Sequence, residues 1–258
     1  MSMASFTRIP LAGGGQETLL SEVGSQYLLP LFSTREACAL RLVCREFLAA
    51  VSEQVWEDRE TMIKGRIASW RACFPRAHCA NVTRKYAMGP PFAPVQEVRR
   101  GTVVDADFVH FEGLRELRMA GCTSVTDAAF VHLRGINALD MSYCGQAGIT
   151  DAAFAHLRGI HTLDVSGMRQ MGITDVAISH LRGIHTLRMR SNGLAGITDA
   201  AFVHLRGIHT LNMANSRRVD LTALAFVQLV GIKSLLMIFC NPALIAIARA
   251  QGLYLGVP

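Results

Sequence analysis

Histidine, cysteine and aspartate residues recur in this sequence at regular intervals, and these residue types can bind metal ions or act in catalysis. Two series of histidines begin at residue 110: His110, His132, His156, His180 and His204, and then His161, His185 and His209. Cys122, Cys144 and Cys240 recur in the same region, which also contains Asp140 and Asp164. The chemistries to consider are therefore a metal site along the histidines and a hydrolytic pair of carboxylates.

The regularity itself argues against both kinds of site. A repeated unit copies every residue type that it contains, so a row of histidines needs no ligand to explain it. Four arginines lie two residues after members of the first series: Arg134, Arg158, Arg182 and Arg206. Their positive charges disfavour a bound cation. The two aspartates are expected on an open sheet, which does not exclude water. We expect no catalytic residue, no metal, no cofactor and no enzyme activity.

A repeat of 24 residues must position these side chains. Copies begin at Val125, Ile149, Ile173 and Ile197, a degenerate copy begins at Leu221, and another begins at Val103 with a spacing of 22 residues. Periods of this size are typical of solenoids, in which each unit buries its apolar face against its neighbours. One unit buries too little apolar surface to offset the entropy of ordering it. Stacking and terminal caps are therefore required.

Each unit is predicted to form a short helix, a tight turn and a short strand. In the copy from Ile149, apolar residues as far as Leu157 fall on one helical face. Leu163 and Val165 alternate with polar residues, as in a half-buried strand.

The ends of the predicted helix carry their own signals. Thr150 is suited to the N-cap position, and the negative charge of Asp151 is suited to the positive end of the helix dipole. Arg158 is suited to the other end, and Gly159 can adopt the left-handed conformation that ends many helices. Gly183 holds the same place one repeat later.

The strand segment resembles the leucine-rich-repeat consensus, L-x-x-L-x-L-x-x-N/C. In six copies the ninth position is occupied by Cys122, Cys144, Met168, Asn192, Ser216 and Cys240. The run from Cys122 to Asp127 closely resembles the C-x-x-I-T-D join of cysteine-containing repeats. The resemblance implies an α/β leucine-rich-repeat solenoid over residues 103–240, with a curved parallel sheet and helices on its convex side. A small helical domain is expected before it.

Residues 20–56 do not repeat, and they resemble an F-box. An apolar run in the first helix, a V-C-R-x-aromatic element and a closing V-W carry the resemblance, with Ser21 at the place of the family's proline. F-box proteins with cysteine-containing repeats are substrate receptors of cullin-based ubiquitin ligases. The resemblance implies that this segment binds a Skp-type adaptor, and thereby the cullin core. The residues concerned are Leu20, Leu28, Leu29, Phe32, Val43, Cys44, Phe47 and Trp56.

The solenoid would then select the client protein. Strand alternation and position predict a concave binding face made by Glu116, Arg118, Asp140, Tyr143, Asp164, Arg188, Arg190 and Asn212. Its acidic centre lies between arginines, which suits a partner with a basic centre. The alternative is a free-standing repeat scaffold whose N-terminal helices serve only as a cap.

The organisation predicted along the chain has five parts. They are a flexible segment at 1–18, the F-box-like domain at 19–60, a basic linker and N-terminal cap with a degenerate repeat at 61–102, six repeats at 103–240, and a C-terminal cap at 241–258. The caps are expected to use a helix near Met62 to Cys73, a strand at Ala80 to Val82 and a helix at Pro242 to Ala250.

Charge and hydropathy narrow the range of partners. The net charge of +6 comes mainly from residues 61–102, which carry 8 basic and 1 acidic side chains and no nucleic-acid motif. We therefore expect a solvated face there and consider nucleic acid an improbable partner. The sequence has no apolar run of membrane-spanning length, and its opening residues contain no apolar run of signal-peptide length. We expect a soluble protein of the cytoplasm, the nucleus or both, with its seven cysteines reduced.

Overall fold

The computed structural model describes residues 29–42, 45–84, 102–145, 148–168, 172–192, 196–215 and 221–253. The chain divides into two compact units, one of residues 1–56 with 73–77 and the other of residues 57–72 with 78–258. The second unit contains the repeats. The predicted flexible segment at 1–18 lies outside the described residues, as does most of the predicted linker after Arg84.

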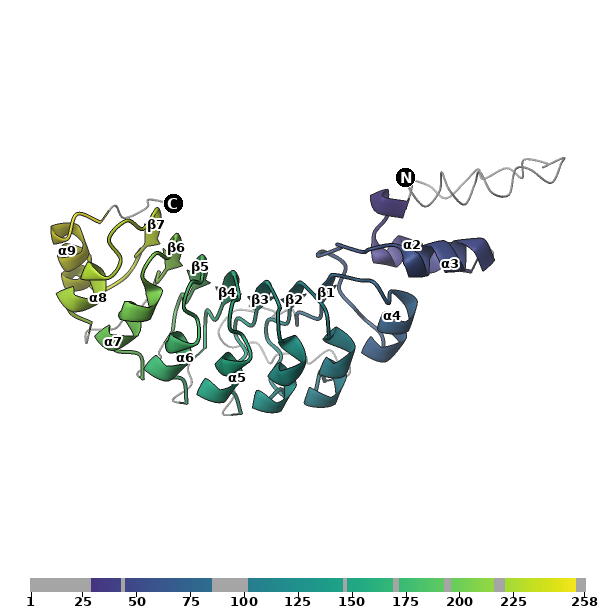
Figure 1. The fold of residues 1–258 in the computed structure, drawn as a ribbon, viewed down its shortest axis with the longest axis horizontal. Coiled ribbons are helices and arrows are strands. Elements are labelled where there is room, and N and C mark those ends of the chain that lie inside the picture. The colour runs from purple at the N-terminus through teal and green to yellow at the C-terminus, as the bar shows by residue number, and fades with distance from the viewer. Residues whose placement is uncertain are drawn as a thin grey trace, which may run out of the picture. The chain divides into compact units, whose positions relative to one another are not determined.

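Seven strands form one open sheet in chain order, so each strand pairs with the next one along the sequence (Figure 1). They are β1 (Cys79–Asn81), β2 (Glu116–Arg118), β3 (Ala138–Asp140), β4 (Thr162–Asp164), β5 (Thr186–Arg188), β6 (Thr210–Asn212) and β7 (Ser234–Leu236). Every pairing is parallel. The strand expected at Ala80 to Val82 is present one residue earlier as β1, and it pairs with the strand of the first repeat.

Short helices cover one side of the sheet, one in each repeat (Figure 1). They are η3 (Asp105–Phe111), η4 (Asp127–Leu133), α5 (Asp151–Ala155), α6 (Asp175–Ser179), α7 (Asp199–Phe202) continued by η5 (Val203–Leu205), and α8 (Ala223–Val227). The first two are tighter 3-10 helices. The helix, turn and strand predicted for each repeat are thus confirmed.

The core repeats with the sequence. In the copy from Ile149, the side chains of Phe154, Leu157, Ile160 and Leu163 are all buried between helix and sheet. Burying one such side chain contributes about 1.5–3 kcal/mol, so each repeat is held mainly by this apolar layer.

The predicted helix signals are present. The hydroxyl of Thr150 accepts a hydrogen bond from the N–H of Ala152 at 3.3 Å, which makes Thr150 the N-cap. Gly159 and Gly183 have φ values of +80° and +82°, in the left-handed region that side chains disfavour.

Helices also stand at both ends of the solenoid. α4 (Ile67–Cys73) precedes β1 and begins later than the helix expected from Met62, although it ends at the expected residue. α9 (Pro242–Ala250) follows β7 at the bounds expected from the sequence. In α9 the side chain of Asn241 caps the helix, Pro242 occupies its first turn, and Leu244 is buried. Among the described residues, no helix has the length and apolarity that crossing a membrane requires.

The first unit contains η2 (Leu29–Leu31), α2 (Thr34–Leu40) and α3 (Arg45–Glu53). Ser33 begins α2 with a capping box, in which its hydroxyl and the carboxylate of Glu36 each accept a backbone N–H. Trp56 is buried in this unit, where its indole N–H donates to the carbonyl of Val51 at 2.9 Å and its ring meets Phe74 edge to face.

Candidate protein-binding surface

A row of charged and polar side chains crosses the sheet at matched positions. The strand register pairs Arg118 with Asp140, Asp140 with Asp164, Asp164 with Arg188 and Arg188 with Asn212. The central leucine of each of these strands is buried, so the flanking side chains face away from the core. The alternation predicted from the sequence is confirmed, and neighbouring members of the row are about 4.8 Å apart at the backbone.

Three members of this row also shape the turn that follows each strand. The carboxylate of Asp140 accepts the N–H of Ser142 at 3.0 Å, and that of Asp164 accepts the N–H of Ser166 at 2.9 Å. In the same place the amide oxygen of Asn212 accepts the N–H of Ala214 at 3.0 Å. Because a neutral amide performs this task in one repeat, the local structure does not require the negative charges.

The charge of Asp164 is disfavoured by its surroundings. Burial raises the pKa of this carboxyl, and the neighbouring Asp140 adds to the rise, whereas hydrogen bonds from Ser166 and the charge of Arg188 oppose it. A partly desolvated carboxylate gains more from a cationic ligand than an exposed one does. The pair is therefore a suitable centre for recognising a basic group.

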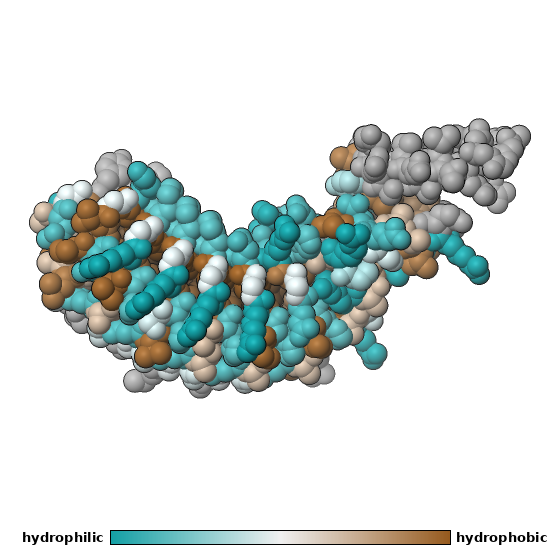
Figure 2. All heavy atoms as spheres, in the orientation of Figure 1, coloured by the Kyte–Doolittle hydropathy of each residue, from teal (hydrophilic) through white to brown (hydrophobic). Residues whose placement is uncertain are grey.

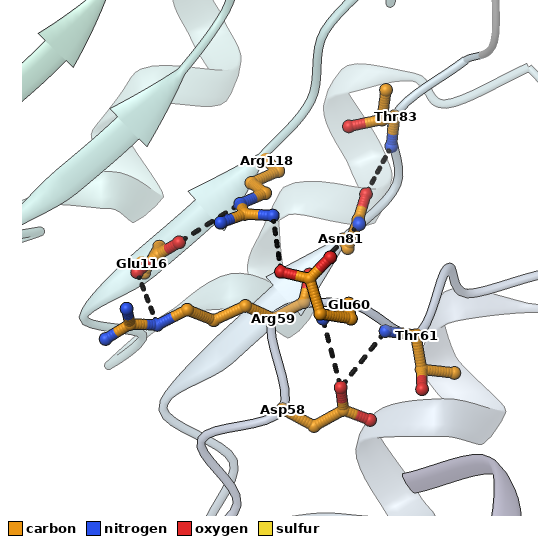
Figure 3. Close-up of polar contacts among 8 residues, drawn as sticks. All are labelled: Asp58, Arg59, Glu60, Thr61, Asn81, Thr83, Glu116 and Arg118. Carbon is orange, nitrogen blue, oxygen red and sulfur yellow. Dashed lines mark hydrogen bonds and ion pairs between the residues drawn. The ribbon is translucent and has the colours of Figure 1, made fainter. Parts of the chain in front are cut away.

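Two residues predicted to bind the client are already engaged within the solenoid (Figure 3). Glu116 forms an ion pair with Arg59 at 2.9 Å, and Arg118 contacts both Glu116 at 3.2 Å and Glu60 at 3.0 Å. Asn81 secures the same segment by donating to the carbonyl of Arg59 at 3.0 Å. Glu116 and Arg118 thus attach the segment from Glu57 to Ile63 to the first strands of the sheet. Their role in binding a client stays a prediction.

One backbone position beside the concave face is left-handed in every repeat. It is occupied by Gly121, Tyr143, Gly167, Ser191, Asn215 and Phe239, with φ between 52° and 73°. Tyr143 and Phe239 are exposed there, and bulky residues in this conformation are uncommon. The ring of Tyr143 covers Gly167 so closely that a Cβ at that glycine would lie 2.4 Å from the ring. Tyr143 is therefore an exposed aromatic with a fixed position.

The structure places the remaining predicted residues on the same face. Asp140, Asp164 and Arg188 are adjacent in the row, and Tyr143 lies in the loop after β3. Arg190 is exposed beyond β5, where its N–H donates to the hydroxyl of Ser166 at 3.2 Å. Ser142 and Ser166, which alternation places outward, are buried instead, because the chain has begun to turn there.

The cysteines at the ninth position have a structural task. The thiol of Cys144 donates to the carbonyl of Met119 at 3.2 Å, and that of Cys240 donates to the carbonyl of Met213 at 3.0 Å. Burial raises the pKa of the Cys122 thiol to about 11 and that of Cys144 to about 12. Such thiols are protonated near neutral pH and are poor nucleophiles.

The histidines of the second series contact one another and the threonines that follow them. The rings of His161, His185 and His209 stack with centroids 4.4 and 4.3 Å apart, and each Nδ1 contacts the hydroxyl of the threonine that follows it. Stacked rings direct their nitrogens in parallel, so adjacent rings do not converge on one ion. Within the described ranges, no cluster of three or more His, Cys, Asp or Glu residues is arranged to hold a metal.

One repeated contact was missed in the sequence. The aspartate at the start of each helix accepts both the N–H and the hydroxyl of the threonine that caps the next helix. The pairs are Asp105 with Thr126, Asp127 with Thr150, Asp151 with Thr174, Asp175 with Thr198, and Asp199 with Thr222. The assignment of Asp151 to the helix dipole alone was therefore incomplete, because its carboxylate also joins two repeats.

The residues predicted to bind the adaptor divide into three groups. Leu20, Leu28, Val43 and Cys44 lie outside the described residues. Leu29 and Trp56 are buried, so they support the helices and offer no surface to a partner. Phe47 is half-buried and Phe32 is exposed. Leu31 and Leu42, which the prediction did not include, are 78% and 88% exposed.

No family model matches the chain, and no curated protein sequence matches it. Solved structures are similar in fold. A structure of the TLR13–ssRNA13 complex matches with a TM-score of 0.54 and 15% identity, over 78% of this chain and 28% of that one. A structure of the Rad7–Elc1 complex from yeast matches with a TM-score of 0.49 and 14% identity, over 83% of this chain and 63% of that one. This chain thus spans less than two thirds of the length of either.

The class of fold follows from the open parallel sheet, the helices on one side of it and the likeness to TLR13. The second unit is a leucine-rich-repeat solenoid, as the repeat pattern predicted.

Proposed function

We propose that the chain is a protein-binding scaffold that recognises a client on the concave face of the solenoid. The row in which Asp140 and Asp164 lie between Arg118 and Arg188 carries this proposal, together with the exposed ring of Tyr143. Aromatic and arginine side chains are enriched in protein interfaces, and charge complementarity selects the partner. With Arg118 paired internally, the free charge of the centre is acidic, which suits a basic segment of a client.

We further propose that the first unit binds a Skp-type adaptor, which makes the chain the substrate-recognition subunit of a cullin-type ubiquitin ligase. The F-box-like pattern of residues 20–56 supports this role. The exposure of Leu31 and Leu42 adds to it, because a bound adaptor would cover these large apolar side chains. The absence of enzyme activity stays a prediction.

Binding of a purified Skp-type adaptor to the full chain tests the second proposal. Leu31→Asp and Leu42→Asp place charges on the exposed apolar side chains, and each is expected to abolish co-elution with the adaptor in size-exclusion chromatography. Val176→Asp is the matched control, since Val176 is an exposed apolar residue of α6 in the other unit. If the wild-type chain shows no affinity for the adaptor, the alternative holds: a free-standing scaffold whose N-terminal helices only cap it.

A further inference from the structure

A second surface lies on the flank of the solenoid, where each helix turns into the following strand. The turns are residues 110–115, 132–137, 156–161, 180–185, 204–209 and 228–233, and together they contain six basic residues and one acidic residue. The basic residues are Arg115, Arg134, Arg158, Arg182, Arg206 and Lys233, all of them exposed. We name this set the basic flank. Figure 2 shows hydrophilic side chains forming a row over successive repeats.

Four arginines of the basic flank are held in place by histidine or glutamine side chains of the following repeat. The Nε of Arg134 donates to Nδ1 of His156 at 3.4 Å, and the Nε of Arg182 donates to Nδ1 of His204 at 3.1 Å. The Nε of Arg206 donates to the side-chain oxygen of Gln228 at 2.6 Å. Arg158 makes the corresponding contact through a terminal nitrogen, with its Nη2 3.3 Å from Nδ1 of His180. Each contact reaches from one repeat to the next, and where Nε is the donor the terminal N–H groups of the guanidinium stay available. The guanidinium groups are therefore oriented before any ligand arrives, which lowers the entropy lost on binding.

Within the part of the chain that the structure describes, no carboxylate forms an ion pair with the four flank arginines from Arg134 to Arg206. The ion pairs found there involve Arg59, Arg118, His78 and His132. Glu112, the acidic residue of the turns, contacts His132 at 2.6 Å. Like charges in successive repeats repel one another, so an anion bound along the row would relieve an unfavourable interaction.

The neighbouring aromatic rings do not suit nucleic-acid bases. Single-stranded nucleic acids are held by bases that stack on aromatic faces. Along this flank the faces of His161, His185 and His209 are turned toward one another, nearly parallel at 12° and 15°. The six turns contain one Phe, Tyr or Trp residue, which is Phe111, and its side chain is buried.

We propose that the basic flank binds an extended acidic segment of a polypeptide. Such a segment, running across the repeats, presents carboxylates to successive guanidinium groups, whose paired N–H donors match the two oxygens of a carboxylate. The basic flank is formed by the turns before the strands, and the acidic centre of the concave face is formed by the strands themselves. An acidic segment on the flank therefore leaves the concave face free to bind a basic segment.

Fluorescence anisotropy with a labelled oligoglutamate peptide and the full chain tests the proposal. The flank variant carries Arg134→Gln, Arg158→Gln, Arg182→Gln and Arg206→Gln, which keep a donor for the histidine or glutamine partner of each. The control carries Arg35→Gln, Arg45→Gln, Arg66→Gln and Arg249→Gln, which remove the same charge from exposed positions elsewhere. We expect Kd to rise about tenfold or more in the flank variant alone, and binding of the wild type to weaken as salt is added.

Three results would overturn the proposal. The first is an absence of peptide binding by the wild type at low salt. The second is an equal loss in both variants, which would show attraction to net charge alone. The third is tighter binding of a single-stranded oligonucleotide of equal charge, which would assign the flank to nucleic acid.

Discussion

The carboxylate of Asp151 accepts two hydrogen bonds from Thr174 in the next repeat, from its N–H at 2.8 Å and from its hydroxyl at 2.6 Å. The same hydroxyl accepts the N–H of Val176 at 3.2 Å and so caps helix α6. Stacking between repeats and the start of each helix are therefore joined in one group of hydrogen bonds. Such bonds to a charged acceptor are stronger than neutral ones.

Loss of this carboxylate should destabilise the solenoid. Asp151→Ala leaves the partly buried N–H and hydroxyl of Thr174 without their acceptor, and we expect a loss of about 1–3 kcal/mol in the free energy of unfolding. Asp151→Asn keeps one acceptor oxygen and should lose less. Chemical denaturation measures both. A value for Asp151→Ala within about 0.5 kcal/mol of the wild type would show that the contact adds nothing.

Tyr143 and Gly167 should be coupled energetically. Gly167→Ala places a Cβ against the ring of Tyr143 and strains a left-handed backbone, whereas Gly183→Ala strains the backbone in open space. We expect Gly167→Ala to be the more destabilising by about 1 kcal/mol or more, and the excess to vanish when Tyr143→Ala is added. Equal losses in both alanine variants, measured by denaturation, would contradict the close packing of this ring.

Sequence reasoning succeeded where one repeat determines its own structure. The threonine caps, the glycine turns and the buried strand leucines depend on neighbours within about 15 residues, and periodicity reveals them. The junction between Asp151 and Thr174 depends on how two units stack, which spacing alone does not show. A signal was present in the last repeat, where Ala223 replaces the aspartate and no further threonine cap follows.

The contacts of Glu116 and Arg118 could not be predicted for a related reason. Both residues face outward, as alternation predicted, but the segment from Glu57 to Ile63 returns to pair with them. Nothing in the repeat pattern indicates that a segment outside the repeats binds at this end of the sheet.

Removing the negative charge of Asp164 should not destabilise the fold, in contrast to the loss expected at Asp151. Its pKa is raised by burial and by Asp140, so the ionised form is disfavoured in the folded state. The stability that a raised pKa contributes is present at low pH and is lost as the pH rises through the folded pKa. Asp164→Asn should therefore be neutral or stabilising at pH 7, and any gain should disappear near pH 3. Thermal unfolding at the two pH values measures this, and a clear loss of stability at pH 7 would contradict it.

The stacking of His161, His185 and His209 should make the stability of the solenoid depend on pH. Partial desolvation, and then the charges of His209 and His161, lower the pKa of His185 below its ordinary value of 6.5. Stability from this group is present above pH 6.5 and is lost as the pH falls through the lowered value. In NMR titrations, His161→Asn with His209→Asn should raise the pKa of His185. Asn137 holds the equivalent position, so asparagine fits there. An unchanged pKa would rule out the coupling.

Client recognition on the concave face is tested most directly by site-specific photo-cross-linking in cells. A photoreactive amino acid replaces either Arg190, beyond the end of β5, or Val176, on the exposed side of α6. Each is combined with the wild-type centre or with Asp140→Asn and Asp164→Asn, which keep the turn hydrogen bonds as Asn212 does. We predict client adducts at position 190 that the two asparagines abolish, and none at position 176. Adducts confined to position 176, or adducts at position 190 that persist without the two charges, would contradict the proposed site.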